Sequence, residues 1–119
     1  MSAEEVFGRL APPGATPPWE GVADLDTGLA SYIEHGLAEV LGGPGLDLRT
    51  RQLVTIAVLT SAGGCEPQLA FHVGGALRIG VPRDEVVAAI TQVSLYSGIP
   101  RVLNALAVAR KVFAEHGLA

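Results

Sequence analysis

The residues best suited to chemistry are a thiol, an amide and an imidazole that follow one another along one predicted helix. Cys65, Gln68 and His72 are spaced i, i+3, i+7, which places them on one helix face. His72 stands between Phe71 and Val73, in an apolar setting. It is either a core histidine bonded to a backbone carbonyl or a general acid–base group, because imidazole titrates near neutrality.

The neighbours of this histidine have structural as well as functional interpretations. Gln68 is either a helix amide facing solvent or a group that orients a substrate. Cys65 is either a small buried residue near a helix start or a reactive thiol that contacts substrate. Gly74 and Gly75 cost about 1–2 kcal/mol in a helix relative to alanine, so we expect them to permit close helix packing or to make room for a ligand.

A second pair of polar side chains lies on another predicted helix. Gln92 and Tyr96 are spaced i, i+4 among apolar residues, so they face the same way. Tyr96 is either a core aromatic residue whose hydroxyl reaches a partner or a phenol that donates to a substrate oxygen. Further along, Asn104 is expected to anchor a loop carbonyl.

Several kinds of site are excluded by what the sequence lacks. A single cysteine cannot form an internal disulfide, a multi-cysteine zinc site or a two-thiol redox cycle. The glycine pairs lack the lysine and hydroxyl residue of a phosphate-binding loop. His35, His72 and His116 lack metal-ligand spacing. We therefore predict neither a metal nor a cofactor.

The composition is that of a single globular domain. Of 119 residues, 49% are hydrophobic and 17% charged, which excludes a disordered chain. The net charge of −4 argues against a nucleic-acid partner. The apolar runs are too short to span a membrane, and an acidic start is unlike a signal peptide. These features predict a soluble cytoplasmic protein.

Glycine and proline punctuate the chain every 15–20 residues, and this spacing favours helices over strands. Residues 11–19 contain four prolines and are predicted to form a loop or extended arm. We predict an all-α fold of about six helices, at residues 2–10, 22–41, 48–62, 66–79, 82–97 and 100–116.

Charge and hydropathy suggest how the chain is organised. Residues 1–47 hold eight acids and one base, whereas residues 48–119 hold four acids and seven bases. We predict an acidic helical arm (1–45) and a core (46–119), with the acids either solvated or packed on a basic surface of the same or a neighbouring chain. The later helices are too apolar for so small a monomer to bury, so we expect a homo-oligomer.

Four stretches, covering roughly residues 46–116, resemble one protein family. In combination they are similar to the carboxymuconolactone decarboxylase family. The resemblance implies an alkylhydroperoxidase D-like helical fold, a homo-trimer or homo-hexamer, and cofactor-independent chemistry in pockets between helices and subunits. The stretches are 48–57 (LRTRQLVTIA), 69–77 (LAFHVGGAL), 80–86 (GVPRDEV) and 96–100 (YSGIP).

The sequence departs from both branches of that family. The peroxidase branch has a second cysteine where this chain has Gln68, and a relay glutamate where it has Gln52. The decarboxylase branch usually has glutamate at Gln68, arginine at Gly74 and histidine at Gln92. Loss of the arginine removes a fork that would hold a carboxylate, which favours a neutral or larger substrate.

The combined interpretation is a cofactor-free enzyme that acts on a small or specialised-metabolite carbonyl or lactone compound. His72 would be the acid–base group, with Gln68, Gln92 and Tyr96 orienting the substrate or stabilising an oxyanion. The reaction would be a decarboxylation, a dienol isomerisation or a cyclisation. The alternatives are a thiol or peroxide-type enzyme that uses Cys65 alone, and a non-catalytic oligomeric binding protein.

Overall fold

The computed structural model describes residues 1–118, and these form helices with no strand among them. The predicted all-α class is therefore confirmed. Ala119, with which the predicted core ends, lies outside the described residues. In chain order the elements are α1 (Ala3–Leu10), α2 (Pro18–Gly21), α3 (Thr27–Gly36), the π-helix η1 (Leu37–Leu41), α4 (Leu48–Ala62), α5 (Glu66–Arg78), α6 (Arg83–Gln92), α7 (Ser94–Ser97) and α8 (Ile99–Glu115).

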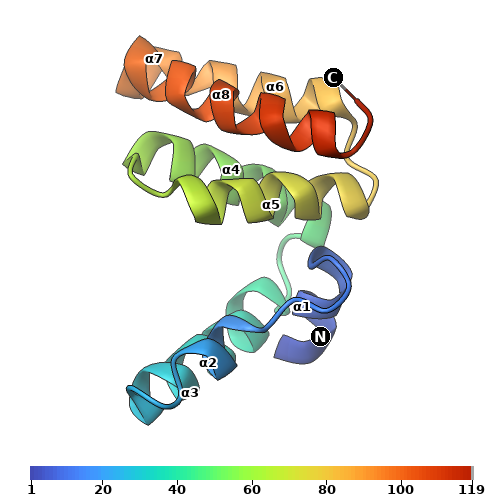
Figure 1. Cartoon of the computed structure of the whole chain (residues 1–119), viewed down its shortest axis with the longest axis vertical. Helices are drawn as coiled ribbons and strands as arrows, with labels where there is room; N and C mark the ends of the chain where they lie inside the picture. The colour runs from blue at the N-terminus through green and yellow to red at the C-terminus, as the bar shows by residue number, and fades with distance from the viewer. Residues whose placement is uncertain (119) are drawn as a thin grey trace.

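The C-terminal helices form a packed bundle, drawn from green to red in Figure 1. Helix α5 packs against α4 and α8, and α6 packs against the same two helices. Their facing sides exclude water completely at Ile56, Val73, Val86, Ile90 and Ala109. Close packing of branched and small side chains is the main source of stability in such a bundle.

The N-terminal helices form a smaller second layer beside α5, drawn in blue and cyan in Figure 1. Trp19 is buried with Ala30 in a cluster of their own. Phe7 of α1 links this cluster to the bundle, because its ring meets Trp19 edge-on at 5.8 Å and stacks on Phe71 of α5 at 5.7 Å. The N-terminal layer is thus attached to the bundle largely through α1.

Gly74 and Gly75 of α5 allow α1 to pack closely against α5. A Cβ atom on Gly75 would lie 3.2 Å from Cβ of Leu10. The guanidinium of Arg78 covers Gly74 and donates a hydrogen bond of 2.6 Å to the carbonyl oxygen of Leu10. Of the two interpretations of this pair, close packing is the one that the geometry fits, and the expected space for a ligand is not found there.

Three helix boundaries differ from those predicted. Helix α3 begins at Thr27 because the carboxylate of Asp26 caps it by accepting from the amide of Leu29 at 2.9 Å. The short helix α2 replaces part of the predicted loop. The helix predicted at 82–97 is interrupted at Val93, whose amide bonds to Ile90 in a tighter turn.

The acids of the N-terminal part lie at the surface. Both ion pairs found within residues 1–118 belong to the later part of the chain, namely Arg49–Glu85 and Arg83–Asp84. The acidic residues before α4 are exposed apart from Glu34, which is half-buried. Within one chain, the acidic side chains of residues 1–45 are therefore solvated and do not pack on a basic surface. The division into an arm and a core stays a prediction.

Replacing Gly75 with alanine is expected to destabilise the protein by about 1–2 kcal/mol, because the new methyl group would press on buried Leu10. Gly8→Ala is the matched control, since a Cβ there meets nothing within 4 Å, and it should stabilise by about 0.5–1 kcal/mol. Urea unfolding of both variants tests this, and equal effects of the two substitutions would contradict it.

Candidate active site

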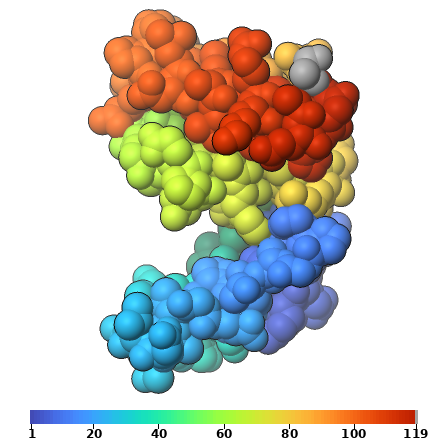
Figure 2. Space-filling model, viewed as in Figure 1, coloured from blue at the N-terminus to red at the C-terminus, as the bar shows by residue number. Residues whose placement is uncertain are grey.

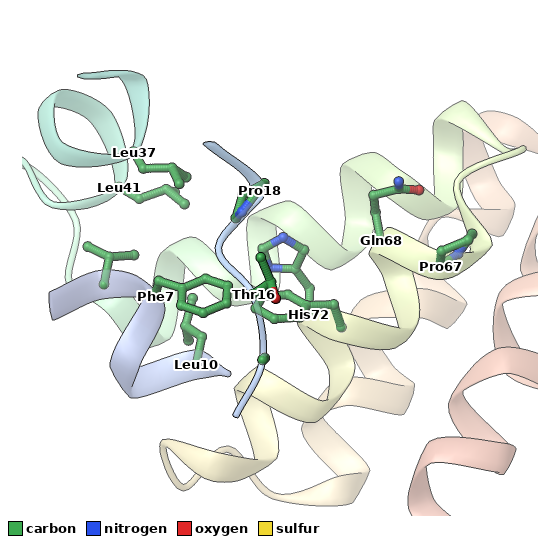
Figure 3. A pocket seen from close by; sticks show the side chains of 12 residues that line it. Phe7, Leu10, Thr16, Pro18, Leu37, Leu41, Pro67, Gln68 and His72 are labelled. Carbon is green, nitrogen blue, oxygen red and sulfur yellow. The ribbon is translucent and has the colours of Figure 1, made fainter. Parts of the chain in front are cut away.

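A cavity of about 320 Å³ lies between α5 and the N-terminal helices. Figure 2 shows the surface hollowed between the beginning of α5 and the N-terminal layer, and Figure 3 shows the side chains around the cavity. Its walls come from α1, the segment leading into α2, η1 and α5. The lining residues are Val6, Phe7, Leu10, Ala15, Thr16, Pro18, Leu37, Leu41, Pro67, Gln68, Phe71 and His72.

His72 is half-buried in the wall that α5 contributes. Its Nδ1 atom lies 3.0 Å from Oε1 of Gln52, a fully buried residue of α4. Burial lowers the pKa of His72 from its ordinary 6.5 to about 4, because an imidazolium would lose its hydration there. The ring is therefore neutral at pH 7.

Gln68 lies one turn before His72, and both side chains rise from α5 toward the cavity in Figure 3. The predicted placement of Gln68 and His72 on one face of the helix therefore agrees with the structure. Cys65 falls outside the cavity because it precedes the first residue of α5. It lines a separate cavity of about 100 Å³ with Arg101, and its thiol donates to the carbonyl of Gly63 at 3.4 Å.

The structure does not bring the second predicted pair to His72 within one chain. Gln92 borders a surface hollow between α4 and α6, beside the Arg49–Glu85 ion pair. Tyr96 is 85% exposed on α7, so its interpretation as a core aromatic residue is wrong. Val86, Ile90 and Val93 form the buried face of this segment, and Gln92 and Tyr96 are both exposed, so the pair lies away from the core.

Two further expectations need correction. Gly74 lies under the side chain of Arg78, and Gly75 lies against Leu10 of α1. Neither glycine lines the cavity. Asn104 is exposed beside the smaller cavity, and the loop anchor is instead Arg101, which donates to the carbonyl of Ala62 at 2.6 Å. A cation at the C-terminus of α4 suits the helix dipole.

The apolar wall from the N-terminal helices was not predicted, and Gln52, noted only at the position of the peroxidase branch's relay glutamate, was not predicted to contact His72. Gln52 is one of four residues spaced by four along α4, and all four are buried (Leu48, Gln52, Ile56 and Thr60). A glutamine within such a line of buried positions is a signal that was available in the sequence. Phe7 and Leu37 gave no comparable signal, because their place depends on how α1 and η1 dock.

Among residues 1–118, no three histidine, cysteine or acidic side chains cluster closely enough to hold a metal ion. No helix among these residues combines the length and apolar character required for crossing a bilayer.

The cavity brings together a half-buried neutral imidazole and two exposed polar groups, the amide of Gln68 and the hydroxyl of Thr16, among apolar side chains. A neutral imidazole can accept a proton, and an amide or hydroxyl can donate to an oxygen on which charge develops. The arrangement is that of a small acid–base site in a helical bundle. Enclosures of this size are typical of sites for small organic molecules.

Comparison with known proteins identifies the family. Residues 28–111 match the model of the carboxymuconolactone decarboxylase family, and the chain belongs to that family. The match includes α3 and η1, which the resemblance seen in the sequence did not cover. Family membership supports a decarboxylase-like function.

Two relatives share 37% identity with the chain. One is a 4-carboxymuconolactone decarboxylase of Acinetobacter baylyi, aligned over 101 residues that cover 84% of this chain and 75% of the relative. The other is an uncharacterized 15.0 kDa protein encoded in the nqo9–nqo10 intergenic region of Paracoccus denitrificans. That alignment covers 87 residues, 72% of this chain and 65% of the relative's length.

The lowered pKa of His72 predicts a specific pH dependence of stability. Between pH 6.5 and about 4, the unfolded chain binds a proton at this residue and the folded chain does not, so stability falls as the pH is lowered through this window. Urea unfolding of His72→Gln should show a weaker fall than the wild type. His35→Gln, at an exposed histidine, is the control, and parallel curves for His72→Gln and wild type would contradict the assignment.

Proposed function

We propose that this chain is an acid–base enzyme that moves a proton at a carbon next to the carbonyl group of a small carbonyl or lactone compound. The net reaction would be a dienol isomerisation or a cyclisation or, for a substrate that carries a carboxyl group beside its carbonyl function, a decarboxylation. One observation carries the proposal: among the side chains of residues 1–118 that line the cavity, His72 alone has an ionisable group, and its neutral ring can accept a proton.

His72 would act first as a base. Its ring is neutral above about pH 4, so it can take a proton from the substrate at neutral pH. The imidazolium formed in this apolar wall would be more acidic than that of an exposed histidine. It would therefore return the proton readily to another carbon of the substrate. Gln68 and Thr16 have donors at the cavity that suit the oxygen of an enolate.

The cavity favours a substrate without charge. No lining side chain from the described part of the chain is cationic, so a carboxylate would find no ion-pair partner there. Arg78 is engaged by the carbonyl of Leu10. The Acinetobacter relative is named for a carboxylated lactone. We propose that this chain takes an uncharged or larger carbonyl compound, such as a specialised metabolite.

The single-thiol alternative is less well supported, because Cys65 lies at a separate and smaller cavity. Neither Gln68 nor His72 lines that cavity. The imidazole that would receive the thiol proton in such an enzyme therefore does not lie beside Cys65 within one chain.

Self-association is part of the proposal, because several large apolar side chains have no cover within one chain. Leu95 and Tyr96 of α7 are 81% and 85% exposed, and Ile99 and Leu103 follow one turn apart on α8. Contiguous apolar surface of this kind is typical of interfaces between copies. A neighbouring copy could also bring Gln92 or Tyr96 to a site that they do not reach within their own chain.

Leu103→Glu is expected to disrupt the assembly, because a buried carboxylate without a partner opposes association. Sedimentation of the wild type should give a mass at least about three times the 12.3 kDa of the chain, and the variant a smaller one. Leu46→Glu, at an exposed leucine outside this patch, should leave the mass unchanged. A monomeric wild type would contradict the proposal.

Proton transfer can be measured before the net reaction is known. In D₂O, the enzyme should exchange the protons next to the carbonyl of 4-carboxymuconolactone dimethyl ester, followed by NMR, faster than those of the free acid. His72→Gln should slow this exchange by about 100-fold or more. His35→Gln is the control, because this histidine is exposed and bonds to Ser31 on its own helix.

Three results would count against the proposal. Unchanged exchange in His72→Gln would exclude this residue as the base. Faster turnover of the free acid, with release of CO₂, would exclude the preference for uncharged substrates. No exchange by a folded protein on either compound, together with tight binding of the ester, would favour the non-catalytic binding alternative.

A further inference from the structure

Behind the cavity, His72 is held by one buried side chain. Gln52 lies on α4, is fully buried, and places Oε1 3.0 Å from Nδ1 of His72. Helices α4 and α5 pack directly against each other, so both ends of this contact are fixed by the bundle. The nitrogen of the ring that would do chemistry is the other one, Nε2.

The chemistry of the contact determines where the ring carries its proton. An amide oxygen can only accept, so Nδ1 of His72 must donate to it. A neutral imidazole has one N–H, and therefore Nε2 keeps a free lone pair. In water a free histidine prefers the opposite tautomer, with the proton on Nε2. The contact with Gln52 thus reverses the intrinsic preference of the ring.

Resting on the function proposed above, we infer that Gln52 is a positioning residue: it fixes His72 in the Nδ1–H tautomer, so that Nε2 is available as the base at the cavity. Gln52 itself does not line the cavity, and it acts through the ring. A base with its proton on Nε2 would offer no lone pair to a substrate on that side.

Packing alone does not account for a glutamine at this position. The side-chain amide nitrogen of Gln52 is buried and has no hydrogen-bond partner. Such an orphan donor costs roughly 1–3 kcal/mol. The positions four residues away on α4 are apolar, at Leu48 and Ile56, and a leucine of similar size would avoid the cost. The amide is therefore explained by the one bond that it makes.

The uncharged character of the amide matters as much as its geometry. A carboxylate at this position would stabilise the imidazolium and raise the pKa of His72, whereas an amide leaves the ring neutral. No charged side chain of α1, η1, α4 or α5 lines the cavity. On α4, Arg49 pairs with Glu85, and Arg51 donates to the carbonyls of Pro44 and Leu46.

The tautomer can be read directly by NMR. In protein labelled with ¹⁵N-histidine, two-bond proton–nitrogen spectra at pH 7 distinguish a ring protonated at Nδ1 from one protonated at Nε2. The signals of His72 are assigned by their loss in His72→Gln. We expect the wild type to show Nδ1–H. Gln52→Leu should shift the ring toward Nε2–H, because it removes the acceptor.

Gln52→Glu is the second informative variant, because it keeps an acceptor and adds a charge. It should retain Nδ1–H and raise the titration midpoint of His72 by about one unit or more. Thr60→Val is the matched control, since Thr60 is another buried polar residue of α4 whose hydroxyl bonds to its own helix at 2.8 Å. It should leave both tautomer and midpoint unchanged.

Each outcome bears on the inference without a substrate. An Nε2–H ring in the wild type would overturn it, because the amide nitrogen and not the oxygen would then face the ring. A titration midpoint unmoved in Gln52→Glu would also overturn it. If Gln52→Leu fails to fold, the wild type and Gln52→Glu still decide. Failure of the proton-exchange assay would leave these spectra unaffected, so the two proposals can fail separately.

Discussion

The contact between α1 and α5 is the constraint on which the rest of the structure depends. It is made where two glycines let the helices approach and where the guanidinium of Arg78 reaches the carbonyl of Leu10. Because the N-terminal layer has only a small core around Trp19, its position is set mainly by this contact and by the stacking of Phe7 on Phe71. Without α1 docked there, His72 would stand on an open helix face instead of in a cavity.

Burial on one side and a single hydrogen bond on the other define the state of His72. The apolar wall removes the hydration that an imidazolium needs, and the amide of Gln52 gives the neutral ring a partner without adding charge. These two effects act in the same direction. They keep the ring unprotonated at neutral pH, and the apolar wall makes a charged substrate expensive to accommodate.

The sequence predicted what depends on short-range pattern. Helix class, most boundaries and the pairing of Gln68 with His72 follow from spacing and from glycine and proline punctuation. The interpretation of Tyr96 as a core aromatic residue did not hold, because spacing predicts which residues share a helix face but not which face the bundle covers. The wall built by Phe7 and η1 depends on docking between distant segments, which local periodicity does not encode. Residues 1–10 therefore looked like an arm rather than part of a site.

The cavity draws its two walls from different parts of the chain, which meet in a shared cluster of Val6, Leu10 and Leu48. The proposed proton-transfer residue and its partner belong to the bundle, on α5 and α4, whereas α1, η1 and the segment before α2 supply the opposite wall. Substitutions at Thr16, Pro18 or Leu37 in that opposite wall can alter the size and shape of the cavity without touching the hydrophobic cluster of the bundle. A lineage could therefore exchange one substrate for another by varying its first forty residues, with the reacting machinery inherited unchanged.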